Sequence, residues 1–142
     1  MLGTSELRPY FLCLLAETCA ETGRLDDGLN ALTEALAAAD EHDLRFYEAE
    51  THRLRGELLS KQDDSNAAEA QSCFQRAIEI ARKQSAKSWE LRATTSLARL
   101  LDQQGRRDEA RTMLSEIYGW FTEGFDTTDL KDAKALLEEL VG

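Results

Sequence analysis

The sequence predicts an all-α fold, and three observations support this prediction. The 142-residue chain contains 22 Leu, 19 Ala and 16 Glu, residues that favour helices. It contains only three Ile and one Val, whereas strands are rich in β-branched residues. Apolar residues recur at intervals of three and four along most of the chain, as on one face of a helix. A chain of this length is the size of one domain, so we expect residues 1–142 to form a single unit.

Each predicted helix of the first half begins or ends at a recognisable residue. The first begins at Pro9, because proline suits the first turn of a helix, and ends at Gly23, which can adopt a left-handed cap. The second begins at Leu25 and carries two aspartates in its first turn, where the helix dipole favours acidic side chains. A third helix over residues 45–62 leads into the polar turn "DDSN", and Asn66 is the predicted N-cap of the fourth.

The second half of the chain continues the helical pattern. Helices are predicted over residues 67–84, 88–104 and 106–121. Asp126 is the predicted N-cap of a last helix. Four apolar residues of this last helix lie at helical spacing: Leu130, Ala133, Leu137 and Leu140. Their single stripe predicts a helix with one packed side.

The chain contains an internal repeat of small and large residues. In the first copy, Ala16 is followed after 7, 12, 16 and 19 residues by Gly23, Gly28, Leu32 and Ala35. In the third copy, Ala98 is followed at the same four intervals by Gly105, Ala110, Leu114 and Ile117. In the second copy, Gly56 is followed after 14, 18 and 21 residues by Ala70, Phe74 and Ala77, because the "DDSN" turn adds two residues.

This repeat predicts a stack of helix pairs. A small residue in the first helix lets the second helix cross closely, and a large apolar residue of the second helix packs against it. Because one such pair cannot bury its own apolar face, neighbouring pairs must stack into a solenoid. We therefore expect three pairs, at about residues 9–41, 44–84 and 87–121, and a capping helix at about residues 127–141.

The small–small–large–small series resembles that of the tetratricopeptide repeat (TPR) family. The resemblance covers about residues 9–118 and implies a right-handed α-solenoid whose first helices line a concave, protein-binding groove. The spacing of 40 to 42 residues exceeds the family's usual length of about 34. It is similar to the extended repeats of kinesin light chains and of the maltose-regulator type of bacterial activator. Gly28 stands where the family has alanine, and Arg55 and Thr94 stand where apolar residues are common.

Four segments resemble the C-terminal repeat region of large bacterial predicted ATPases, which often carry an adenylate or guanylate cyclase domain or a DNA-binding domain. They are "RPYFLCLLAE", "FYEAETHRLRGELL", "AEAQSCFQRAIEIARKQSAKSWELRATTSLARL" and "YGWFTEGFDTTDLKDAKALLEEL". The chain contains no G-x-x-x-x-G-K-[ST] phosphate loop and nothing similar to a cyclase core. The resemblance therefore implies a regulatory interaction module of a larger bacterial protein, not ATPase or cyclase activity.

The family's geometry, carried onto this sequence, predicts a partner-binding groove. The strongest candidates for partner contact are Tyr10, Glu17, Arg53, Glu57, Arg92 and Arg99. The other positions expected on the same surface are Leu14, Glu21, Lys61, Ser96 and Gln103. Arginines gather at one end of the groove, and their forked side chains suit the carboxylates of an acidic peptide segment. In the alternative interpretation, Arg53, Glu57 and Arg92 only pair with one another across adjacent helices.

Charge and hydropathy restrict the class of partner. The net charge is −10, with 15 acidic and 6 basic side chains in residues 1–71 but 12 and 11 in residues 72–142. A net acidic chain repels phosphate backbones, so we expect no nucleic-acid partner. The chain has no apolar run of the ~18 residues that a membrane span needs, and "MLGTSELRPY" does not resemble a signal peptide. We expect a cytoplasmic protein that binds a protein or peptide segment, which includes another domain of its own parent protein.

Two alternatives stay open beside this expectation. The polar groove is also compatible with the sensing of a small molecule. A stack of three pairs leaves apolar faces at its ends, so a homo-oligomer is compatible with the sequence as well.

No catalytic, cofactor or metal site is predicted. "EHD" at residues 41–43 and His52 lack the spacing of a zinc motif, and "DDSN" lacks the glycine and distal glutamate of a calcium loop. Cys13, Cys19 and Cys73 lie within helical patterns, so we expect buried structural thiols. A nucleophile formed by Cys73 with His52 lacks any feature that would ionise the thiol. The chain is therefore predicted not to be an enzyme.

An aromatic segment, "YGWFTEGFDTTDL", follows the third repeat at residues 118–130. One interpretation is a ligand site, and the other is a joint that covers the end of the stack. Gly119 and Gly124 can turn the chain, and a solenoid needs a terminal cap. We predict the joint, in which three aromatic side chains cover the stack end: Trp120, Phe121 and Phe125.

Overall fold

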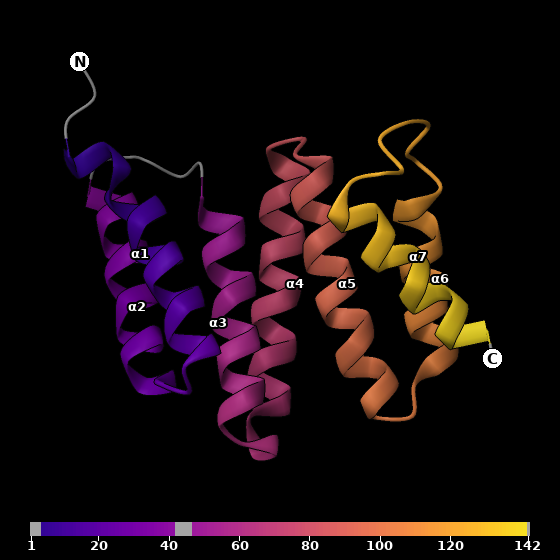
Figure 1. Ribbon diagram of the computed structural model, residues 1–142, viewed down its shortest axis with the longest axis horizontal. Coiled ribbons are helices and arrows are strands. Elements are labelled where there is room, and N and C mark those ends of the chain that lie inside the picture. Colours follow the sequence, from indigo (N-terminus) through magenta and orange to yellow (C-terminus); the bar gives the residue numbers. More distant parts are fainter. Residues whose placement is uncertain (1–3, 42–46, 142) are drawn as a thin grey trace.

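The helices stand side by side along the long axis of the molecule (Figure 1). The computed structural model describes residues 4–41 and 47–141, and it describes side chains for residues 10–38 and 47–141. Within these ranges the regular structure consists of seven α-helices and one short 3-10 helix. They are α1 Thr4–Glu21, α2 Leu25–Glu41, α3 Glu48–Gln62, η1 Asp64–Asn66, α4 Ala67–Lys83, α5 Lys87–Gln103, α6 Arg107–Tyr118 and α7 Thr128–Val141. The prediction of an all-α fold is confirmed.

Each helix packs against the next one in the chain, and every second helix also packs against the next but one. α1 with α2, α3 with α4 and α5 with α6 are antiparallel pairs joined by short turns (Figure 1). α1 also contacts α3, α3 contacts α5 and α5 contacts α7. These four helices therefore form one continuous side of a solenoid, with α7 in the place of the first helix of a further pair.

The small residues of the repeat lie where the helices of a pair cross. In the first and third pairs a fully buried alanine meets a fully buried leucine: Ala16 with Leu32, and Ala98 with Leu114. In the second pair the large residue is Phe74, and a Cβ atom on Gly56 would lie 2.6 Å from its Cε1 atom. Glycine therefore replaces alanine in this pair because the side chain that crosses it is larger.

Two glycines end the first helices of their pairs as left-handed caps. Gly23 and Gly105 both have φ of +79°. The backbone N–H that follows each glycine donates back to the last turn, from Arg24 to Cys19 and from Arg106 to Leu101, both at 2.8 Å. The predicted cap at Gly23 is confirmed, and its counterpart in the third pair has the same geometry.

The predicted start of α1 is wrong. The helix begins at Thr4, five residues before Pro9, so the proline lies beyond the first turn. Since proline has no N–H, the helix continues across it with one backbone hydrogen bond fewer.

Asn66 occupies the N-cap position of α4, as predicted, but the expected capping bond is absent. The side chain of Asn66 makes no capping bond, and its Nδ2 instead donates to the carbonyl of Leu59 at 3.1 Å. The turn is set by Asp63, whose carboxylate accepts the backbone N–H of Ser65 at 2.8 Å and begins η1. The "DDSN" segment is thus a helix-entry turn, as predicted, but a different residue organises it.

The segment that follows the third pair acts as a joint only in part. α6 ends at Tyr118, and Phe121 packs against the core. Trp120 and Phe125, however, are 58% and 45% exposed, so the prediction that all three aromatic side chains cover the stack end is wrong.

The start of α7 differs from its prediction as well. α7 begins at Thr128, and the hydroxyl of Thr127 accepts the N–H of Leu130 at 3.5 Å, in the capping role predicted for Asp126. The apolar stripe of α7 is buried at Leu130, Ala133 and Leu140, and Leu137 packs partly buried against the core, as predicted. Among the described helices, none has both the length and the apolar character needed to cross a membrane.

Candidate partner-binding groove

The side of the solenoid formed by α1, α3, α5 and α7 carries the predicted groove residues. A hollow of about 130 Å³ lies between α3, α5 and α7. Six side chains that border it are Arg53, Arg92, Ser96, Arg99, Asp129 and Asp132. Three of the six predicted contact residues therefore meet at one place, and two carboxylates of α7 lie beside them.

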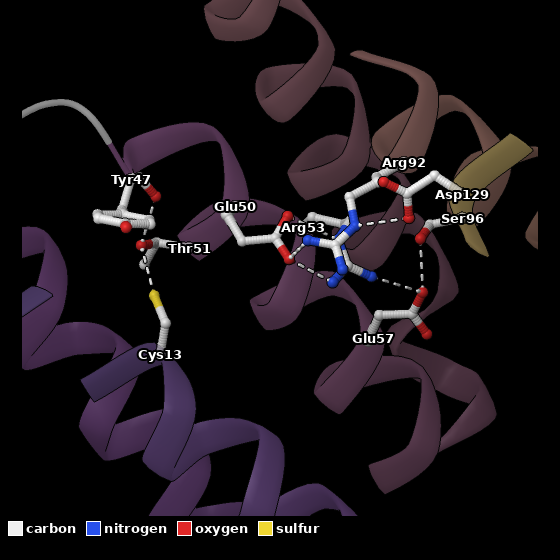
Figure 2. Close-up of polar contacts among 9 residues, drawn as sticks. All are labelled: Cys13, Tyr47, Glu50, Thr51, Arg53, Glu57, Arg92, Ser96 and Asp129. Carbon is white, nitrogen blue, oxygen red and sulfur yellow. Dashed lines mark hydrogen bonds and ion pairs between the residues drawn. The ribbon is translucent and has the colours of Figure 1, made fainter. Parts of the chain in front are cut away.

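A buried carboxylate organises the arginines. Glu50 of α3 has a side chain that is only 7% exposed, and Arg53 and Arg92 both point toward it (Figure 2). Arg53 forms a two-pronged contact, with Nη2 2.6 Å from Oε1 and Nε 3.0 Å from Oε2. Nη1 of Arg92 donates to the same Oε1 at 2.8 Å. An unpaired carboxylate would be unfavourable at this degree of burial. The two arginines neutralise Glu50 and hold its side chain in one position.

Arg92 joins three helices. It extends from α5 to Glu50 on α3, and its Nε donates to Oδ1 of Asp129 on α7 at 3.1 Å (Figure 2). A second link between α3 and α5 is the hydroxyl of Ser96, which donates to Glu57 at 2.6 Å. The positions of these side chains are therefore fixed by the stacking of three successive first helices.

Arg53 and Arg92 pair with carboxylates of the chain, as the alternative interpretation expected, but the partner they share is Glu50. Arg53 lies 3.7 Å from Glu57 as well as beside Glu50, and Arg92 pairs with Glu50 rather than with Glu57. Burial opposes the charge of Arg53, but the hydrogen bond and negative charge of Glu50 outweigh this effect and raise the pKa of the guanidinium. Two of the three arginines are therefore already engaged by carboxylates.

Arg99 differs from the other two arginines. It is exposed on α5 and borders the same hollow. Among the residues that the structure describes, Arg99 has no hydrogen-bonded or ion-paired partner. Of the three arginines at this hollow, Arg99 is therefore the one that no carboxylate of the described residues neutralises.

Sequence reasoning missed Glu50, although the repeat contained the signal for it. Glu50 and Arg92 occupy equivalent positions of the second and third repeats, 42 residues apart. Equivalent positions of successive first helices face one another in a solenoid. Opposite charges at equivalent positions therefore predict an ion pair between repeats.

An aromatic row crosses the same side of the solenoid and was also missed. The ring centroids of Tyr10 and Tyr47 lie 5.2 Å apart, and those of Tyr47 and Trp89 lie 5.5 Å apart. Tyr47 and Trp89 again occupy equivalent positions of the second and third repeats. Tyr10 and Glu17 belong to α1 and do not border the hollow, so the predicted contact residues fall into two groups.

The three cysteines are free and buried, as predicted. The Sγ atom of Cys13 lies 3.2 Å from the hydroxyl of Thr51, which joins α1 to α3 (Figure 2). Burial raises the pKa of the Cys13 thiol from an ordinary value of 9.0 to about 11, and its hydrogen bond with Thr51 offsets only part of this effect. Burial likewise raises the pKa of Cys73 and lowers that of His52, so both side chains are uncharged near pH 7.

The sequence predicts no metal site, and part of this prediction concerns residues whose side chains the structure does not describe. The side chains of "EHD", residues 41–43, lie outside the described residues. Within the described ranges, no group of three or more His, Cys, Asp or Glu side chains is arranged to hold a metal ion.

The raised pKa of Cys13 makes the stability of the protein depend on pH. Because the unfolded thiol ionises near pH 9.0 and the folded thiol near pH 11, unfolding releases a proton between these values. The stability that the buried thiol contributes is therefore fully present below pH 9. It is lost as the pH rises toward 11, by about 2–3 kcal/mol in total. Urea denaturation across this range should show the loss in the wild-type protein, and Cys13→Ala should reduce it. An unchanged pH dependence in the variant would contradict this account.

Repeated helix pairs that stack in order, with small residues at their crossings, define an α-solenoid. The tetratricopeptide repeat family model matches residues 47–119, about half of the chain. The chain belongs to the tetratricopeptide repeat family. Repeats of this family generally mediate protein–protein interactions and are typically not catalytic. A comparison with curated proteins finds no match.

Proposed function

We propose that this chain is a non-catalytic interaction module that binds a protein or peptide segment in the groove along α1, α3, α5 and α7. The observation that carries the proposal is the hollow between α3, α5 and α7, where an exposed arginine without a partner stands beside two paired ones. Membership of a family whose repeats mediate protein–protein interactions supports it. The proposed contact residues are Tyr10, Glu17, Arg53, Glu57, Arg92 and Arg99.

The charges of the groove define the chemistry of the segment. Arg53 and Arg92 are neutralised by Glu50 and Asp129, so Arg99 provides the free positive charge of the hollow, and the carboxylate of Asp132 borders the same hollow. The hollow of about 130 Å³ has room for one side chain rather than for a whole helix. We therefore expect an extended segment that places one carboxylate on Arg99, with aromatic or apolar side chains along the row that starts at Tyr10.

The resemblance of four segments to the repeat region of large bacterial predicted ATPases supports a more specific role. In this proposal the chain is the cytoplasmic regulatory repeat region of a bacterial signalling or transcription-regulating protein of the ATPase or cyclase type. The segment in the groove then belongs either to a separate protein or to another domain of the same protein.

Reversal of the charge of Arg99 is the direct test of the groove. Peptides selected from a display library for binding to the wild-type chain should bind Arg99→Glu at least about tenfold more weakly, because a charge-assisted hydrogen bond is replaced by repulsion. Fluorescence anisotropy of labelled peptides measures the affinities. The matched control is Arg111→Glu, which makes the same charge change at an exposed arginine of α6.

The selected peptides also test the expected chemistry. Carboxylates should be enriched among them, and binding should weaken as the salt concentration rises. Equal affinities of Arg99→Glu and Arg111→Glu for every selected peptide, with unchanged helical content by circular dichroism, would remove the hollow from the proposed function.

A small-molecule sensor is the second candidate. A hollow of about 170 Å³ lies between α4, α5 and α6, where Lys87 Nζ lies 5.5 Å from the ring centroid of the exposed Trp120. Lys87 also pairs with Glu90 at 3.3 Å, so the hollow offers a small ligand an exposed aromatic side chain beside a lysine–glutamate pair. A thermal-shift screen with nucleotides, sugars and amino acids tests this candidate, and a flat response across the panel would count against it.

A further inference from the structure

Arg92 and Arg99 border the same hollow, but a carboxylate of α7 already holds Arg92. The guanidinium of Arg92 is bound from two sides: Nη1 donates to Glu50 of α3 at 2.8 Å, and Nε donates to Asp129 of α7 at 3.1 Å (Figure 2). Arg99 is exposed and has no such partner among the described residues. An internal carboxylate therefore stands where a carboxylate of a bound segment would otherwise meet Arg92.

The two contacts of Arg92 differ in burial. The side chain of Glu50 is 7% exposed and is also bound by Arg53, whereas that of Asp129 is 32% exposed. In the part of the chain that the structure describes, Asp129 pairs with Arg92 alone. Partly exposed ion pairs stabilise a protein little, whereas breaking a buried pair is costly. Asp129 is therefore the partner of Arg92 that another carboxylate can replace.

α7 can stay in place when this carboxylate moves away. The helix is held in the core by four buried residues: Leu130, Ala133, Leu136 and Leu140. Toward its other end, Nη2 of Arg107 donates to the carbonyl of Glu139 at 2.6 Å. Asp129 lies in the first turn of α7 and borders the hollow. Rotation of its side chain alone therefore frees Arg92 and leaves room for one further carboxylate.

α7 brings a second carboxylate to the same hollow, that of Asp132. Asp132 is exposed and has no hydrogen-bonded or ion-paired partner among the described residues. It therefore places the same charge beside the hollow as Asp129 does, but it holds no arginine. The chain thus contains its own comparison for the effect of holding Arg92.

We propose that Asp129 is an internal competitor of the bound segment: it holds Arg92 in the free chain and is displaced by a second carboxylate of the segment. This inference rests on the proposed function, because it concerns a segment that places its first carboxylate on Arg99. Arg92 and Arg99 lie seven residues apart on one side of α5, about 10.5 Å along the helix axis. About three residues of an extended chain span this length. A second acidic side chain about three residues from the first can therefore reach Arg92.

Competition changes what the second carboxylate contributes. In the wild-type chain it gains Arg92 only by breaking the contact of Asp129, so the number of ion pairs stays the same. Without the carboxylate of Asp129, the same side chain adds a charge-assisted hydrogen bond. Asp129 therefore makes the groove bind segments with one or two carboxylates almost equally well.

Peptide pairs test this competition. The starting peptide is one that binds the wild-type chain and that Arg99→Glu weakens. Its variants carry either glutamate or glutamine at each other position, and fluorescence anisotropy gives the ratio of the two affinities. In the wild-type chain the largest ratio should stay below about twofold. In Asp129→Asn it should reach about tenfold, at a position about three residues from the first carboxylate.

Two further variants separate competition from a general effect of charge. Asp132→Asn removes the same charge from the same hollow but frees no arginine, so its ratios should remain those of the wild type. Arg92→Gln, added to Asp129→Asn, should return the ratio to below about twofold, because the second carboxylate then has no arginine to meet. Circular dichroism and thermal unfolding first establish that each variant keeps the wild-type fold.

The outcomes distinguish this inference from the proposed function. Equal ratios in Asp129→Asn and Asp132→Asn, for peptides that depend on Arg99, would overturn the inference alone. Asp129 would then only stabilise the first turn of α7, where the helix dipole favours acidic side chains. A ratio near tenfold in the wild-type chain would overturn it as well. If Arg99→Glu bound every selected peptide as tightly as the wild type, the proposed function would fail, and this inference with it.

Discussion

Replacement of Gly56 by leucine is expected to lower the free energy of unfolding by about 3 kcal/mol, and even Gly56→Ala by about 1 kcal/mol. A Cβ atom at this position would lie 2.6 Å from Cε1 of Phe74, closer than real Cβ contacts come. Phe74 is only 2% exposed, so its ring has little room to move away. In a helix interior alanine is normally more favourable than glycine by about 1 kcal/mol. A loss of stability in Gly56→Ala would therefore show that the clash with Phe74 outweighs this preference. Urea denaturation measures the effect.

A double variant provides the control for this prediction. Gly56→Ala combined with Phe74→Leu recreates the alanine–leucine crossing of the first and third pairs. We expect the double variant to be more stable than the sum of the two single changes implies, because the smaller side chain removes the clash. Strict additivity of the two changes would contradict the steric explanation.

Replacement of Glu50 by alanine is expected to lower the free energy of unfolding by about 3 kcal/mol. The carboxylate is 7% exposed and pairs with both Arg53 and Arg92, so its loss removes the counter-charge that the two guanidinium groups share and leaves them only Glu57 and Asp129. The matched control is Glu69→Ala, which removes a 55% exposed partner of Arg55 and should change stability by less than about 1 kcal/mol. Chemical denaturation of the three proteins gives the comparison.

This prediction also has a clear contrary outcome. If Glu50→Ala and Glu69→Ala change stability equally, the cluster around Glu50 contributes no more than a surface ion pair. In that case a partner could displace Glu50 from Arg53 and Arg92 at little cost in stability.

The fold was predictable from the sequence because its main constraint is steric. Small residues at helix crossings recur with large ones opposite them, and this pattern can be read without coordinates. Gly28, which departs from the family's alanine, also has a steric reason in the structure. A Cβ atom there would lie 3.0 Å from Cδ1 of Leu58 in the next pair and 3.2 Å from Cβ of Cys19.

The helix starts were harder to predict, because several polar residues compete for each one. In "DDSN" and in "DTT", neighbouring side chains are chemically capable of the same capping bond, and a shift of one residue selects a different one. Asp63 and Thr127 organise these turns, where Asn66 and Asp126 were expected. Which side chain forms the capping bond depends on the direction in which the chain enters the helix. The packing of the helices sets that direction.

The groove was predicted in outline but not in its contacts. Arg53, Arg92 and Arg99 lie together as expected, but the sequence alone did not show that Glu50 and Asp129 neutralise two of them. Ion pairs between helices depend on which side chains face each other after stacking. Comparison of equivalent positions in successive repeats would have revealed the pair of Glu50 with Arg92, and offers a general route to such contacts.

The cluster around Glu50 also bears on the mechanics of the solenoid. Arg92 connects α3, α5 and α7 through two carboxylates, so the second and third pairs and α7 resist bending relative to one another. The first pair is attached to α3 by apolar packing of Leu54 and Leu58, by a hydrogen bond from Gln62 to Asp26 and by a thiol–hydroxyl contact, which tolerate small rotations more easily than the shared carboxylates do. We therefore expect a stiff body at the C-terminal end and a pivot between the first and second pairs. A pivot there would change the curvature of the groove while leaving the arginine hollow undistorted.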